Sequence, residues 1–134
     1  SLITSLNNIT NDITEQFSDE KLQKTLQTTS RIISPSDFGF QNTLIDNDAV
    51  YFVDFEYAGW DDPAKLICDF GSQPGIPVND EYLQTFKVSF LTWLEDAEVS
   101  IHRSEILMPL YRLKWCCIML NEFTKTGRNR RNHT

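Results

Sequence analysis

Cysteine and histidine are scarce in this chain, which has three cysteines and two histidines among its 134 residues. None of the cysteines Cys68, Cys116 and Cys117 belongs to a CxxC pair or stands near a histidine in the sequence. These spacings exclude the usual zinc-site patterns. Adjacent Cys116 and Cys117 cannot face one partner from a single helix without distortion. We therefore expect reduced thiols, with this pair packed in the interior.

Long apolar runs are missing as well, because no stretch approaches the roughly 18 residues that a membrane span requires. The sequence also shows no signal-peptide pattern, so we expect a soluble, cytoplasmic protein. Basic residues are few, with 12 Lys and Arg against 19 Asp and Glu and a formal net charge of −7. This balance argues against nucleic acid or an anionic membrane as partner and suits cations better.

A hydrophobic content of 40%, with 12% aromatic residues, is enough to form one packed core in a chain of this length. We therefore predict a single domain over residues 1–134. Four of the 12 basic residues fall in the last ten positions, namely Lys125, Arg128, Arg130 and Arg131. No apolar periodicity accompanies them, so residues 125–134 are predicted to be a flexible basic tail.

The chain opens with apolar residues at helical steps of three and four, which are Leu2, Leu6, Ile9, Ile13 and Phe17. Ser18 is suited to cap a second helix, which would carry Leu22 and Leu26 and end before the polar residues 28–30. A first helix that needs a partner face suggests a fragment of a longer protein.

Short β-prone runs follow at residues 31–33, 43–45 and 50–53. The last two are separated by Asp46, Asn47 and Asp48, residue types that tolerate positive φ and bond to their own backbone. This pattern predicts a small hairpin.

The second half of the chain has the apolar periodicity of helices. Asn79 is expected to cap a helix whose apolar stripe comprises Tyr82, Phe86, Phe90, Trp93, Leu94 and Ala97. A last helix is predicted with Pro109 in its first turn and with Gly127 ending it or lying in the tail. Its successive turns are expected to carry Leu110, Tyr111, Lys114, Cys117, Ile118 and Asn121. The predicted fold class is α+β, mainly α-helical.

The residues that indicate chemistry lie between Ser34 and Pro63. Kinases place a catalytic Asp and a magnesium-binding Asn five residues apart in one loop, and Asp37 and Asn42 have this spacing. Asp54 follows the strand predicted at 50–53 and can supply a second carboxylate. Magnesium prefers such hard oxygen ligands and keeps waters and phosphate oxygens as the others.

The run Ser36-Asp37-Phe-Gly-Phe-Gln-Asn42, with the later segments 53–59 and Asp62-Pro63, resembles the catalytic core of the aminoglycoside phosphotransferase and choline kinase superfamily. The resemblance covers about residues 33–70. It implies the C-terminal lobe of a protein-kinase-like fold with a catalytic hairpin, which uses Mg²⁺ and ATP or GTP to phosphorylate a small-molecule hydroxyl. By position, Asp37 is the catalytic base, Asn42 and Asp54 are metal ligands, and Asp62 helps brace the catalytic loop.

The sequence departs from this family in three places. Pro35 and Ser36 stand where the family has His-Gly, and Leu66 stands where it has an Asp after the Asp-Pro pair. Asp69 is expected to take over that bracing role or to cap a helix. No Gly-rich phosphate loop and no strand Lys with a helix Glu occur, so we expect the nucleotide-binding N-lobe to be absent and the fragment to be inactive alone. Apolar surface left by a missing lobe could drive self-association.

Two other functions stay open. The substitutions at Pro35 and Ser36 suit a degenerate kinase-like module that binds or regulates without catalysis. A carboxylate-pair hydrolase has weaker support, since the acids Asp37, Asp54, Asp61 and Asp62 share only their proximity. The acceptor and the substrate-binding residues are not assigned, because a fold does not choose its substrate.

The other residues near the motif are expected to be structural. The aromatic residues Phe55, Tyr57 and Trp60 are predicted to pack in the interior. Glu56 and Asp61 are expected at the surface or in a turn. His102 is predicted to lie exposed in a loop near a helix start.

Overall fold

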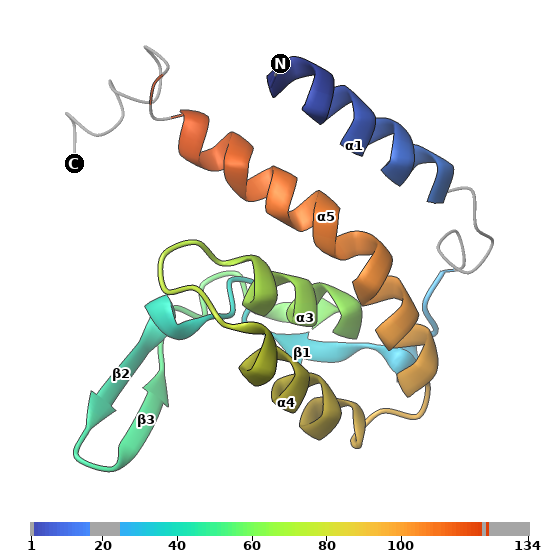
Figure 1. Cartoon of the computed structure of the whole chain (residues 1–134). Coiled ribbons are helices and arrows are strands. Elements are labelled where there is room, and N and C mark those ends of the chain that lie inside the picture. The colour runs from blue at the N-terminus through green and yellow to red at the C-terminus, as the bar shows by residue number, and fades with distance from the viewer. Residues whose placement is uncertain (1, 17–24, 122, 124–134) are drawn as a thin grey trace.

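The computed structural model describes residues 2–16, 25–121 and 123 (Figure 1). Its helices are α1 (Leu2–Gln16), α3 (Pro63–Ser72), α4 (Asp80–Leu91) and α5 (Ala97–Asn121). Its strands are β1 (Ile32–Ser34), β2 (Thr43–Asp46), β3 (Ala49–Phe52) and β4 (Gly59–Asp61), and its 3-10 turns are η1 (Thr28–Ser30) and η2 (Phe40–Asn42). The predicted mainly helical α+β class is therefore confirmed.

The strands form two separate antiparallel pairs. Strands β2 and β3 make the predicted hairpin, with Thr43 opposite Phe52 and Asp46 opposite Ala49. Asn47 in its turn has a φ of 54°, the left-handed conformation that asparagine tolerates. Strand β1 pairs with β4, which returns the chain to the start of α3. Figure 1 shows the hairpin projecting away from the helices.

The core lies where α3, α4 and α5 meet. Its buried cluster consists of Ile67, Cys68, Phe70, Leu83, Leu91 and Met108. Helix α3 is the most enclosed element, since seven of its ten residues are buried. It therefore forms a fixed platform beneath the loop that follows β1.

Both helix caps in this part of the chain use side chains. Asn79 accepts a hydrogen bond from the Tyr82 amide at 2.9 Å, which confirms the predicted start of α4. Asp62 accepts one from the Ala64 amide at 2.8 Å, and Pro63 occupies the first turn of α3, where its missing N–H costs nothing. Each cap satisfies an amide that the helix itself cannot pair.

The boundary between α4 and α5 differs from the prediction. Helix α4 ends at Leu91, so the predicted continuation to Ala97 is wrong, and Trp93 is 86% exposed in the connection. Helix α5 already begins at Ala97 and contains Pro109 in its interior, not in its first turn. Proline removes one amide from the helix, while the packing of α5 against α3 supports the turns on either side.

The predicted first helix is present as α1, which lies beside α5 (Figure 1). The second helix was predicted to start at Ser18, and residues 17–24 lie outside the described part of the chain, as do Gly127 and the tail at 125–134. The predicted extension of this helix through Leu26 to the residues before 28–30 is wrong, since residues 25–27 are not helical.

Two predictions for residues of α5 are corrected. Cys116 and Cys117 are exposed, because these late turns of α5 extend beyond the core formed with α3 and α4. His102 lies inside α5 and is partly buried, not exposed in a loop. Only Cys68 among the three cysteines is buried.

Within the described residues, no helix combines the length and apolar character needed to cross a bilayer.

Candidate functional site

The segment after β1 brings Asp37 and Asn42 together. The Asn42 Nδ2 donates to the carbonyl oxygen of Asp37 at 2.8 Å and lies 3.4 Å from its Oδ2. Gln41 Nε2 lies 3.3 Å from the other carboxylate oxygen, Oδ1. The 3-10 turn η2, which comprises residues 40–42, brings Asn42 back beside Asp37, five residues earlier in the chain. Since Asn42 uses its nitrogen in these contacts, its Oδ1 is the atom left to ligate a cation.

Asp54 is joined to this loop through the backbone. The Val53 amide donates to the carbonyl oxygen of Asn42 at 2.9 Å, so the end of the hairpin is tied to the Asp37 loop. Strand β3 ends at Phe52, so Asp54 lies two residues beyond it and is exposed. The described residues contain no group of three or more His, Cys, Asp or Glu suited to hold a metal. A magnesium ion here would be held by the Asp54 carboxylate and the Asn42 amide oxygen, with water and phosphate oxygens as its other ligands, a set of hard oxygens that suits this cation.

The backbone is unusual at two positions of this site. Ser36 has a φ of 72° and Asp54 a φ of 67°, the left-handed region that costs a residue with a side chain about 1–2 kcal/mol. Asn47 in the hairpin turn has the third such φ recorded for a residue other than glycine in the described chain. Strain of this kind persists only where neighbouring contacts hold it, and it gathers at functional sites.

A lysine missed by sequence reasoning connects this loop to α3. Lys65 Nζ lies 3.2 Å from the carbonyl oxygen and 3.1 Å from the Oγ of Ser36. The same ammonium pairs with Asp61 Oδ2 at 2.7 Å and with Asp69 Oδ2 at 2.9 Å. The spacing of four residues between Asp61, Lys65 and Asp69 is the sequence signal that could have indicated this cluster.

Asp69 lies within α3 and is only 4% exposed, so it does not cap a helix. Burial raises the pKa of its carboxyl, and the ion pairs with Lys65 and Lys114 offset only part of this effect. For Lys65, burial lowers the pKa, but the hydrogen bonds to Asp61 and Asp69 outweigh it and the net pKa is raised. Lys65 thus connects Asp69 to the loop, since the same ammonium contacts both Asp69 and Ser36.

Asp62 makes a different connection. One carboxylate oxygen of Asp62, Oδ1, caps α3. The other, Oδ2, accepts hydrogen bonds from Arg103 Nε at 2.9 Å and from Arg103 Nη2 at 2.6 Å. Arginine's planar guanidinium favours such paired bonds to a carboxylate. This contact joins the start of α3 to α5, whereas the contact with the Asp37 loop is made by Lys65.

The aromatic residues beside Asp54 are exposed, which corrects the prediction that they pack. Phe55 is 53%, Tyr57 73% and Trp60 66% exposed. Their segment runs from the hairpin into β4, which has β1 as its only strand neighbour in the described chain. In the described part of the chain these rings are therefore left exposed, as Asp54 is.

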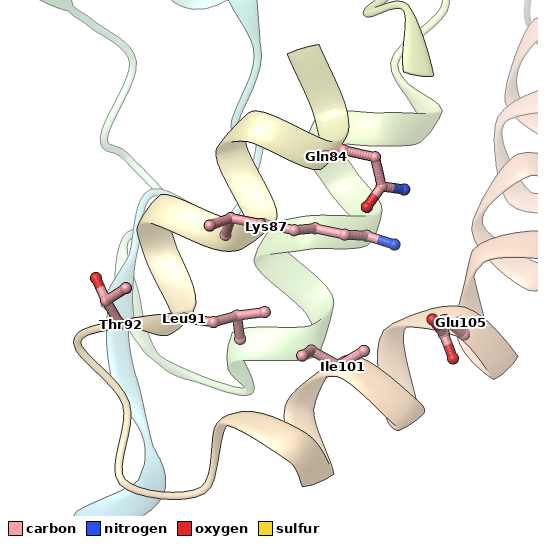
Figure 2. A pocket seen from close by; sticks show the side chains of 7 residues that line it. Gln84, Lys87, Leu91, Thr92, Ile101 and Glu105 are labelled. Atoms are coloured by element: carbon pink, nitrogen blue, oxygen red, sulfur yellow. The ribbon is translucent and has the colours of Figure 1, made fainter. Parts of the chain in front are cut away.

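A groove of about 310 Å³ lies apart from these residues, between α4 and α5 (Figure 2). It is lined by Gln84, Lys87, Val88, Leu91, Thr92, Ile101 and Glu105. Figure 2 shows the Lys87 side chain extending from α4 toward α5. None of the lining residues belongs to the candidate site.

The structure therefore brings Asp37 and Asn42 into contact and ties Asp54 to them through Val53. Asp62 caps α3 and Asp69 lies within this helix. No protein-family model matches this chain, and neither a curated protein nor a solved structure is significantly similar to it. The contacts of the site itself therefore carry the functional proposal.

Proposed function

We propose that this chain carries the base and metal ligands of a phosphotransferase that moves the γ-phosphoryl of ATP or GTP to the hydroxyl of a small molecule. The observation that supports it is the contact between Asn42 and Asp37, in which Asn42 Nδ2 donates to the backbone carbonyl oxygen of Asp37 at 2.8 Å. The Val53 amide, which donates to the Asn42 carbonyl oxygen, joins this pair to the segment of Asp54. A base, an amide ligand and a carboxylate ligand from two joined loops are what kinase chemistry requires.

Each residue has a distinct role in this proposal. Asp37 orients the acceptor hydroxyl and takes its proton. Asn42 Oδ1 and the Asp54 carboxylate hold magnesium, which would neutralise charge on the transferred phosphoryl. The rate enhancement then comes mainly from positioning and electrostatic stabilisation. Nucleotide contacts from a further lobe complete the site, so the chain alone is expected to bind weakly and not to turn over.

A non-catalytic binding module is the second proposal. It is favoured by Ser36, which occupies a left-handed backbone position in place of the family's glycine, and by Pro35 in place of its histidine. The same magnesium and nucleotide would bind, but no phosphoryl would transfer. The experiments below separate the two.

Metal binding is tested first on this chain by a magnesium titration with and without ATP or GTP. Calorimetry and the NMR signal of the Asn42 side-chain amide are the two readouts. Asp54→Ala is expected to weaken metal-dependent nucleotide binding at least about tenfold, because it removes a charged ligand. Asp48→Ala, in the exposed hairpin turn, is the matched control and should bind as the wild type does. Equal binding by all three chains would reject Asp54 as a ligand.

Catalysis is tested by a phosphotransfer screen on the longest natural protein that contains this chain, with assorted hydroxyl compounds as acceptors. Asp37→Asn should lower kcat by about 10²–10⁴-fold through loss of the base, while leaving the KM for nucleotide close to that of the wild type. Undiminished turnover in Asp37→Asn would remove its catalytic role. Nucleotide binding without transfer in the wild type would favour the binding module.

A further inference from the structure

The residue before Asp37 adopts a conformation that its own chemistry disfavours. Ser36 has a φ of 72°, and only glycine takes this region without a steric penalty. Its amide donates to Ser34 Oγ at 3.1 Å, and Ser34 is fully buried in β1. The direction in which the chain enters Asp37 depends on this residue, so whatever holds Ser36 also places the Asp37 carboxylate.

The Lys65 ammonium contacts Ser36 from outside its own segment. It lies within 3.2 Å of both the carbonyl oxygen and the hydroxyl oxygen of Ser36, 29 residues away in the sequence. Together with Asp61 and Asp69, these contacts place four oxygens around a nitrogen that has three hydrogens. At least one hydrogen is therefore shared, and the ammonium is fully engaged.

The other side of this contact is firmly anchored. Asp69 is 4% exposed in the most enclosed helix, and its second oxygen lies 3.5 Å from Lys114 Nζ. The Lys65 side chain is 22% exposed, so much of its length is removed from solvent. An ordinary surface pair four residues apart would contact only its own helix. Here the same lysine also contacts both polar oxygens of a strained residue in the candidate loop.

We infer that Lys65 is a positioning residue, which holds Ser36 in its left-handed conformation from the buried Asp69 anchor and so directs Asp37 toward Asn42. The ordering of the loop by Lys65 is inferred from the geometry alone. A contribution of Lys65 to phosphoryl transfer rests on the proposed function. Lys65 itself touches neither Asp37 nor Asn42 in the recorded contacts of the described chain.

The choice of variant matters because Lys65→Met alone leaves buried Asp69 with only the more distant Lys114. Removing one partner of a buried pair is strongly destabilising, whereas replacing both with neutral groups of similar size is often tolerated. The test variant is therefore Lys65→Met with Asp69→Asn. Lys87→Met in the groove between α4 and α5 is the matched control, since it removes a lysine that is not part of this cluster.

The measurement is amide hydrogen exchange by NMR in this chain. The amides of Ser36, Asn42 and Val53 each donate a hydrogen bond that depends on the loop. They should exchange about tenfold faster in the double variant, as expected for the loss of one hydrogen bond to a charged group. The amides of Ile67 and Phe70 in α3 should keep the wild-type rate, and so should all of these amides in Lys87→Met.

Two further variants distinguish positioning from a purely structural pair. Adding Ser36→Gly to the double variant should restore slow exchange of the Asn42 amide, because glycine adopts positive φ without support. Lys65→Arg should stay close to the wild type, since it keeps a cation within reach of Ser36. Unchanged loop exchange in the double variant, or equal acceleration in α3, would overturn the inference.

Activity gives an independent readout once phosphotransfer is observed. The double variant should then lower kcat and leave the KM for nucleotide unchanged, because Lys65 acts on the base and not on the nucleotide. A lowered affinity with unchanged kcat would contradict this role. If the wild type transfers no phosphoryl, the proposed function fails, while the exchange experiment still decides whether Lys65 orders the loop.

Discussion

At the scale of single residues, polar contacts connect the candidate loop to the helices. Lys65 contacts Ser36 and buried Asp69, and Arg103 pairs with Asp62 at the start of α3. These ions are partly or largely removed from water, where a charge without a partner is costly. Lys65 is four residues from Asp69, but Arg103 is 41 residues from Asp62 and Ser36 is 29 residues from Lys65. The structure therefore assigns Asp62 to helix linkage and Asp69 to the Lys65 contact.

Cys68 leads to a pH prediction, because burial raises the pKa of its thiol to about 12. An unfolded chain ionises cysteine near pH 8.5, so between these two values the folded state keeps a proton that the unfolded state releases. The free energy of unfolding should therefore fall as pH rises through this window, by about 2 kcal/mol between pH 8.5 and 10. Urea unfolding at a series of pH values measures it.

Cys68→Ala isolates this effect. The variant is less stable overall because of the lost packing, but its stability should stay nearly constant between pH 8.5 and 10. Cys116→Ala, at an exposed position, should keep the wild-type pH dependence. The same slope in Cys68→Ala and the wild type would show that another group causes the loss.

At the scale of elements, a connected set of aromatic rings links the loop to the hairpin and the helices. The Phe38 ring lies 5.3 Å from that of Phe52 in β3, 5.3 Å from Phe70 in α3 and 5.7 Å from Phe86 in α4. These separations are typical of favourable aromatic pairs. Because Phe38 directly follows Asp37, the core itself positions the candidate base. The loop is thus fixed by Lys65 on one side and by Phe38 on the other.

Phe38→Ala should lower the free energy of unfolding by about 3 kcal/mol, since it removes a ring with three aromatic neighbours. Phe38→Leu should cost only about 1 kcal/mol, because it keeps most of the apolar volume. Phe55→Ala, at a ring that is 53% exposed, is the control and should change stability by less than about 0.5 kcal/mol. Denaturant unfolding followed by circular dichroism compares the three variants, and equal losses for Phe38→Ala and Phe55→Ala would refute the anchoring role.

At the scale of the whole molecule, large apolar side chains are exposed on the two strand pairs. Ile45 is 76%, Ile33 70% and Trp60 66% exposed, and the hairpin projects from the helices (Figure 1). Its cross-strand pair of Ile45 and Val50 is exposed on both strands. Apolar surface of this kind usually marks an interaction site. We propose that the hairpin mediates self-association of this chain when no other partner covers it.

Sedimentation velocity over a range of protein concentrations tests this proposal. The wild type should sediment faster as concentration rises. Ile45→Lys with Val50→Glu should sediment as a monomer, because opposite charges at this register pair stabilise the hairpin while removing its apolar surface. Val88→Lys, which replaces a side chain 68% exposed on α4, is the control and should leave association unchanged. A wild type that sediments identically at all concentrations would refute the proposal.

The sequence alone was sufficient where the signal is local. The Asp46 to Asp48 turn predicted the hairpin, Asn79 predicted the start of α4, and the spacing of Asp37 and Asn42 predicted two residues that the structure finds in contact. Each of these depends on residues a few positions apart, so local hydrogen bonding and backbone preference determine them.

Only the tertiary structure decided which surfaces are covered and which distant residues meet. The interior position of Pro109, the exposure of Cys116 and Trp60, and the contact of Lys65 with Ser36 were not predicted. Apolar periodicity indicates that a side chain needs burial, and charge indicates that it needs a partner or solvent, but neither identifies the element that provides this environment. That element comes from another part of the chain, because helix ends, burial and ion pairing are settled by packing between segments far apart in the sequence.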